Sequence, residues 1–228
     1  MTVPLRYWAT RVVCWVMVRC YVRLRVVGRE NIPRGPVVFC FGHPSWTDPI
    51  VLMASLPFRP RLFFFGPKEE HMAAGANNRL MAFTGVAVPY RPGKNDLLNT
   101  TRRVAAVFQG GGSLAVAAEG RIHAHEAEIH QLDEGVAYFA LRAGRPIVPV
   151  AINGSTWLAL GRRVRVNIGE PIVARGRPTR EALATLTALA HASLVELSGG
   201  YPDPPRPGPI GRWLTELNNE WPGGERPV

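Results

Sequence analysis

The order of apolar and polar residues changes its period several times along the chain, and each change marks the boundary of an expected element. Residues 5–20 are apolar on nearly every side, which predicts a helix. Residues 21–27 alternate Val or Leu with Arg, a pattern typical of a half-exposed strand. Residues 37–41, Val-Val-Phe-Cys-Phe, form an unbroken apolar run and predict a buried strand.

The rest of the chain continues this alternation of strands and helices. Further strands are predicted at residues 61–65, 86–88, 114–117, 146–152 and 163–168. Helices are predicted at residues 50–56, in a segment ending at 83, and at 95–108, 133–142, 179–197 and 210–221, with Asp133 as one of the caps. Strands separated by helices indicate an α/β layer fold. We divide the chain into an N-terminal helix (1–20), a main domain (21–200) and a Pro-rich linker with a short C-terminal helix (201–228).

Charge narrows the classes of partner. The 228 residues include 27 Lys and Arg against 17 Asp and Glu, for a net charge of +10, which favours nucleic acid, anionic lipid or a phosphorylated substrate. The arginines are scattered singly and in pairs, and no nucleic-acid-binding motif accompanies them, so we expect no nucleic-acid partner. Three cysteines, Cys14, Cys20 and Cys40, form no disulfide framework, which fits a reducing compartment.

The N-terminal helix has the composition of a membrane-interface segment. Its longest run without a charge, Val12 to Val18, is far shorter than the roughly 20 residues that cross a bilayer. Residues suited to the interface, where indoles lie at headgroup depth and guanidinium groups contact phosphates, are Trp8, Trp15, Arg6, Arg11 and Arg19. The alternative is a helix packed on its own domain, and both interpretations can hold together.

One polar pair follows the buried strand at 37–41. His43 stands two residues after the strand, and Asp48 follows where the next helix is expected to begin. An imidazole takes a proton from a hydroxyl near neutral pH, and a carboxylate bonded to its second nitrogen fixes the tautomer. The pair therefore suggests acid–base chemistry, with a helix-capping Asp and a structural His as the alternative.

A second polar cluster lies at residues 122–130. His123, His125 and His130, with Glu126 or Glu128, are residue types that bind a divalent metal. Their spacing is not the His-Glu-x-x-His of zinc hydrolases, and a solvated loop explains the composition equally well. We therefore assign no metal ligand.

Several stretches together resemble the glycerolipid acyltransferase family, which includes the lysophosphatidic acid acyltransferases. The family's blocks are a His and Asp separated by four residues, a Lys-Glu after a strand, an apolar segment ending in Arg, Pro-Glu-Gly-Thr-Arg, and a hydrophobic run with a central Pro. In chain order the corresponding stretches are His43–Asp48, Lys68, Gly85–Arg91, Ala118–Arg121 and Ile147–Val150. The resemblance covers roughly residues 20–175.

The resemblance implies a glycerol-3-phosphate acyltransferase-like domain with a mixed β-sheet flanked by helices. It implies that His43 is the general base and that Asp48 orients it. The substrate-binding residues that it implies are Lys68, Arg91, Glu119, Gly120 and Arg121. The block that matches Pro-Glu-Gly-Thr-Arg departs from the family pattern, because Ala118 replaces Pro and the Thr is missing, which brings Arg121 one residue nearer Glu119.

The function implied is transfer of a fatty acyl group from acyl-CoA or acyl carrier protein to a lysophospholipid hydroxyl. The donor is a co-substrate, and no cofactor is expected. The expected location is peripheral, on an anionic membrane surface at the cytoplasmic face of the cell membrane. Two alternatives stay open: a non-catalytic lipid-binding protein on the same scaffold, and an acyl thioesterase in which water replaces the alcohol.

Overall fold

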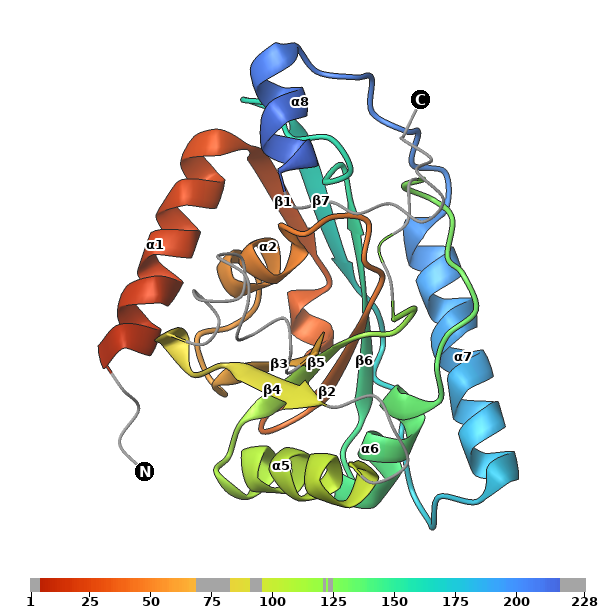
Figure 1. The fold of residues 1–228 in the computed structure, drawn as a ribbon. Coiled ribbons are helices and arrows are strands. Elements are labelled where there is room, and N and C mark those ends of the chain that lie inside the picture. The colour runs from red at the N-terminus through yellow and green to blue at the C-terminus, as the bar shows by residue number, and fades with distance from the viewer. Residues whose placement is uncertain (1–4, 69–82, 91–95, 121, 123–124, 218–228) are drawn as a thin grey trace.

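The computed structural model describes residues 5–68, 83–90, 96–120, 122 and 125–217, without the side chains of residues 67 and 68. The elements of this part of the chain are shown in Figure 1. In chain order they are α1 (Leu5–Tyr21), β1 (Arg23–Val27), the 3-10 turn η1 (Arg29–Asn31), β2 (Val38–Phe41), α2 (Asp48–Ser55), β3 (Leu62–Lys68), β4 (Ala87–Tyr90), α5 (Leu97–Gln109), β5 (Ser113–Ala117), α6 (Gly135–Ala143), β6 (Ile147–Asn153), β7 (Arg163–Ile168), α7 (Arg180–Ser198) and α8 (Pro209–Glu216).

The described strands form one 7-stranded sheet in the order β1-β7-β6-β2-β5-β3-β4. Neighbouring strands are parallel except for the antiparallel pair β6 and β7. Five strands (β6, β2, β5, β3 and β4) therefore run in one direction, and their carboxyl ends share one edge of the sheet. The expected α/β fold with a mixed sheet is confirmed.

Helices cover both faces of this sheet. Along β2 the side chains alternate: Phe39 and Phe41 pack under α1 and α2, whereas Val38 and Cys40 pack under α5, α6 and α7. Figure 1 shows α1 and α2 on one side of the sheet and α7 on the other. A strand buried on both faces needs a continuous apolar sequence, which is why this stretch shows no polar alternation.

The start of α6 differs from the sequence prediction. The helix begins at Gly135 with Glu134 at its N-cap, so Asp133 is not the cap. The backbone N–H of Asp133 instead donates to the carbonyl of Ala118 at 2.8 Å, which ties Asp133 to the turn that follows β5. The predicted helix ending at Phe83 falls almost entirely outside the described residues.

Helix α1 packs against α2, which carries Asp48 at its first position. The buried positions of α1 are Tyr7, Arg11, Cys14 and Val18, spaced to lie along one side of a helix. Arg11 is fully buried, and its Nη2 donates to the carbonyl oxygens of Leu56 at 2.7 Å and Pro57 at 2.9 Å. The prediction that Arg11 contacts lipid phosphates is therefore wrong. The orphan carbonyls at the end of α2 attract this cation inward, as expected at a helix C-terminus.

Candidate active site

Polar residues follow three parallel strands at the shared carboxyl edge. His43, Glu119 and Ser155 each lie two positions after the last residue of β2, β5 and β6, respectively. Because β2 pairs with both β5 and β6, the three loops are neighbours although they are far apart in the sequence. The topology therefore gathers His43, Glu119 and Ser155 into one site.

His43 and Asp48 form the centre of this site. Nδ1 of His43 lies 2.9 Å from Oδ2 of Asp48. The imidazole is partly accessible, with 19% of its side chain exposed, whereas the Asp48 side chain is 0% exposed. The His43 ring also contacts Phe41 edge-on, with ring centroids 5.7 Å apart, which restricts its rotation.

The buried Asp48 carboxylate is held by hydrogen bonds on both oxygens. The backbone N–H of Ser45 donates to Oδ2 at 2.7 Å, and the hydroxyl of Ser155 donates to Oδ1 at 2.8 Å. Donors to both oxygens suit an ionised carboxylate, so Nδ1 of His43 carries a proton and is a third donor. Nε2 is then the basic nitrogen, as a general base requires.

Glu119 joins the turn that carries His43 to the loop before α6. Its Oε2 accepts the backbone N–H of His43 at 3.1 Å, and its Oε1 accepts the backbone N–H of His130 at 2.7 Å. The following residue, Gly120, has a φ of 68°, and a Cβ there would lie 2.9 Å from Oδ2 of Asp133. Only glycine suits this turn, so the Glu-Gly pair has a clear role in shaping the edge of the site.

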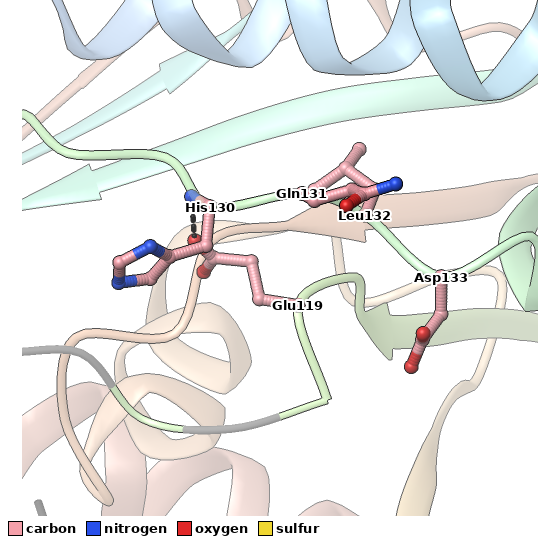
Figure 2. A pocket seen from close by; sticks show the side chains of 5 residues that line it. All are labelled: Glu119, His130, Gln131, Leu132 and Asp133. Atoms are coloured by element: carbon pink, nitrogen blue, oxygen red, sulfur yellow. Dashed lines mark hydrogen bonds between the residues drawn. The ribbon is translucent and has the colours of Figure 1, made fainter. Parts of the chain in front are cut away.

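A pocket of about 550 Å³ opens beside Glu119. It is lined by Glu119 and by His130, Gln131, Leu132 and Asp133 of the adjoining loop. Figure 2 shows the His130–Glu119 hydrogen bond and Asp133 on the opposite side of the pocket lining. The pocket is thus separated from the backbone of His43 by one side chain.

The other predicted binding residues are only partly described. Lys68 is the last residue of β3 at the same sheet edge, and its backbone pairs with Tyr90. The Lys68 side chain and residues Arg91 and Arg121 lie outside the described part of the structure. Their assignment to the substrate stays a prediction.

The polar cluster at 122–130 is organised by structural contacts. Glu126 turns inward, where its carboxylate accepts the backbone N–H groups of Gly154 at 2.7 Å and Thr156 at 2.8 Å. His125 pairs through Nδ1 with Asp203 at 2.9 Å, and His123 is outside the described residues. Among the described residues, no group of three or more His, Cys, Asp or Glu is placed to hold a metal.

Neither Cys40 nor Ser45 is placed as a nucleophile. Burial raises the pKa of the Cys40 thiol, the charge of Glu119 adds to this effect, and the protonated thiol is a poor nucleophile. The Ser45 hydroxyl is fully buried and lies 3.1 Å from Oγ1 of Thr47. These surroundings argue against a covalent intermediate on either side chain.

Sequence reasoning missed Ser155, and it considered Glu126 only as a possible metal ligand. One signal was available, because Asn153-Gly-Ser-Thr156 is a polar segment at the end of the buried strand that carries the hydrophobic run with the central Pro. The pairing of Glu126 with that segment had no such signal, since it joins positions 28 and 30 residues apart through tertiary structure.

Comparisons with known proteins give a family match and a similar solved fold. The family model described as Acyltransferase matches residues 23–153, more than half of the chain. No curated protein matches the sequence. The fold resembles the crystal structure of the 1-acyl-sn-glycerophosphate (LPA) acyltransferase PlsC from Thermotoga maritima, with a TM-score of 0.60 and 16% identity, over 85% of this chain and 80% of that chain.

The chain therefore belongs to the acyltransferase family. It is an acyl-transferring enzyme whose His43–Asp48 turn lies within the matched residues.

Proposed function

We propose that the protein is a membrane-peripheral O-acyltransferase that moves a fatty acyl group from acyl-CoA or acyl carrier protein to a lysophospholipid hydroxyl. The favoured acceptor is 1-acyl-glycerol-3-phosphate, which gives phosphatidic acid. The observation that carries the proposal is the 2.9 Å contact between a partly exposed His43 and a fully buried Asp48. The similar fold of the Thermotoga maritima LPA acyltransferase supports the choice of acceptor.

In this mechanism Nε2 of His43 accepts the proton of the acceptor hydroxyl as its oxygen attacks the thioester carbonyl. The new C–O bond forms, the C–S bond breaks, and the imidazolium returns the proton to the departing thiolate. Asp48 stabilises the imidazolium through Nδ1. General-base assistance of this kind contributes roughly 100- to 10,000-fold in rate.

The acceptor phosphate is assigned to Lys68, Arg91 and Arg121. Guanidinium groups bind phosphate oxygens in a bidentate fork, and the matched family blocks supply the assignment. The pocket beside Glu119 is too acidic, with Glu119 and Asp133 in its lining, to hold a phosphate by itself. We assign it to uncharged polar parts of a substrate, such as the glycerol hydroxyl groups.

Membrane contact is assigned to the outer face of α1. While α1 buries one stripe against α2, its exposed large apolar residues are Leu5, Val12, Val13, Trp15, Val16 and Met17. Arg19 lies over the Trp15 ring at 4.9 Å, an arrangement that suits the boundary between acyl chains and headgroups. In the described part of the chain, no helix has the length and apolar character needed to span a bilayer.

Helix α8 also exposes large apolar side chains. It packs through Gly211 and Thr215 and exposes Ile210, Trp213 and Leu217. Its Thr215 accepts the N–H of Leu158, and the nearby N–H of Gly161 donates to the carbonyl of Tyr21 at the end of α1. We therefore include α8 in the proposed membrane face.

The test is His43→Ala assayed with acyl-CoA and 1-acyl-glycerol-3-phosphate, following thiol release and the lipid product. We expect the rate to fall by at least about 100-fold with the melting temperature retained. Thiol release by the unaltered enzyme without any acceptor would indicate a thioesterase. Binding of the lysolipid without turnover would indicate a non-catalytic protein, and normal transfer by His43→Ala would refute the mechanism.

A further inference from the structure

The loop after β6 connects the catalytic dyad with a buried carboxylate that takes no part in the proposed chemistry. Ser155 and Thr156 of this loop are buried, as is Glu126. Nothing in the matched family blocks assigns a role to these three residues. Glu126 is hydrogen-bonded to the neighbours of Ser155, Ser155 to Asp48, and Asp48 to His43, so the backbone of this loop connects the two sets of contacts.

Ser155 makes the contact between this loop and Asp48. Its hydroxyl donates to Oδ1 at 2.8 Å across 107 positions of sequence, while Ser45 N–H and His43 Nδ1 share Oδ2. Two points of attachment fix the plane of a carboxylate, whereas Oδ2 alone would leave it free to rotate. The direction of the His43 ring depends on that plane, because Nδ1 follows the lone pairs of Oδ2.

Glu126 holds the segment that carries Ser155. Its two oxygens accept the N–H groups of Gly154 and Thr156, the residues on either side of Ser155, and Oε1 also accepts the Thr156 hydroxyl. The side chain of Asn153 donates to the Glu126 carbonyl at 2.9 Å. The backbone on both sides of Ser155 is thus fastened to one residue.

We propose that Ser155 is a positioning residue that sets the orientation of Asp48 and thereby of His43, and that Glu126 fixes the loop that presents Ser155. The proposal rests on the proposed function, in which His43 is the general base. It predicts a defect in the chemical step rather than in substrate binding, since both side chains are buried and bonded to protein groups.

The central experiment compares Ser155→Ala with the unaltered enzyme. We expect kcat to fall about 10- to 100-fold, the range for losing one hydrogen bond to a charged group, with KM for both substrates within about threefold. The matched control is Ser113→Ala, another buried serine, whose hydroxyl accepts the N–H of Val37 at 3.1 Å at the opposite edge of the sheet. It should lower stability and leave kcat unchanged.

A second comparison places Ser155→Ala in an Asp48→Asn background. If Ser155 acts through the Asp48 carboxylate, the two losses overlap, and Ser155→Ala adds less than about threefold there. Equal losses in both backgrounds would overturn the proposal. So would a Ser155→Ala enzyme with normal kcat while His43→Ala is inactive, whereas an active His43→Ala enzyme would refute the proposed function instead.

Two variants complete the test. If Ser155→Ala does not fold, Ser155→Cys keeps the shape of the side chain with a larger terminal atom and supplies only a weak donor, so the same loss of kcat is expected. Glu126→Gln places an amide NH₂ beside the backbone N–H of Gly154 or Thr156, so one of these N–H donors loses its acceptor. It should lower kcat about 3- to 10-fold in the native background and add nothing to Ser155→Ala. A full additional loss in the double variant would overturn the role of Glu126.

Discussion

Replacing Asp48 with Asn removes the charge from the dyad while keeping its shape. An amide has one acceptor oxygen, and the structure decides where that oxygen points. The Ser45 N–H at 2.7 Å and the protonated Nδ1 of His43 both require an acceptor at the Oδ2 position. The NH₂ group then faces the Ser155 hydroxyl, whose oxygen accepts it. The fold and the tautomer are therefore expected to survive, and the loss comes from the missing charge.

The size of that loss follows from the geometry. An imidazolium and a carboxylate with their charge centres about 4 Å apart attract each other by about 4 kcal/mol at an effective dielectric constant near 20. The attraction exists only when the proton is on His43, so it stabilises the transition state and not the resting enzyme. At 1.36 kcal/mol for each factor of ten, kcat should fall roughly 1,000-fold.

The assay is thiol release at saturating acyl-CoA and acceptor, with a thermal melt for each variant. Asp96→Asn is the matched control, since Asp96 is a buried Asp at the start of α5 whose carboxylate accepts the Thr100 hydroxyl. It should retain full activity. Turnover of Asp48→Asn within about threefold of the unaltered enzyme would show that Asp48 only begins α2 and has no electrostatic role.

Three further predictions concern other parts of the molecule. Arg91→Ala should raise KM for a phosphorylated acceptor about tenfold and leave KM for the acyl donor within about threefold, because one charge-assisted contact is lost; equal effects in initial-rate measurements would place Arg91 outside the acceptor site. Burial raises the pKa of Glu126 to about 7 from an ordinary 4.5, and the charge of Asp48 adds to this. The folded protein therefore keeps a proton that the unfolded chain has lost between these pH values. Relative to Glu126→Gln, the free energy of unfolding of the unaltered protein should fall by about 2–3 kcal/mol as the pH of urea titrations rises from about 5 to about 8. If the stability of the two proteins changed with pH in the same way, the raised pKa would be contradicted. The double variant Val16→Glu, Met17→Glu on the exposed face of α1 should lose flotation with anionic vesicles at low salt while keeping its melting temperature; undiminished flotation would exclude α1 from the membrane face.

The local features of the site were present in the sequence. The apolar run before Gly42 predicts a strand, and the five-residue step from His43 to Asp48 fits a turn into a helix. Both residues lie in one short segment, so the pair forms through a turn and needs no distant partner. The strand at 163–168 was likewise predicted with the observed boundaries, because its apolar and polar residues alternate.

The order of the strands was decided only in three dimensions. Alternating strands and helices predict a layered fold, but they do not state that β2 lies between β5 and β6. That arrangement brings Glu119 to the backbone of His43, 76 positions away in the sequence. It also brings Ser155 to Asp48, 107 positions away. Nothing in the sequence around these polar residues indicates which other loop they contact.

Arg11 is a residue for which the sequence suggests the wrong surroundings. Its sequence neighbours are those of an interfacial helix, so a charged side chain there is expected to face water and lipid headgroups. In the fold it is fully buried and satisfies carbonyl groups more than 40 positions away. Sequence periodicity determined which segments become helices and strands, and motif spacing determined where the His43–Asp48 pair lies, because both depend on nearby residues. Which side of α1 is buried, and which buried groups brace Asp48, depended on hydrogen-bond partners that only the packing of distant segments supplies.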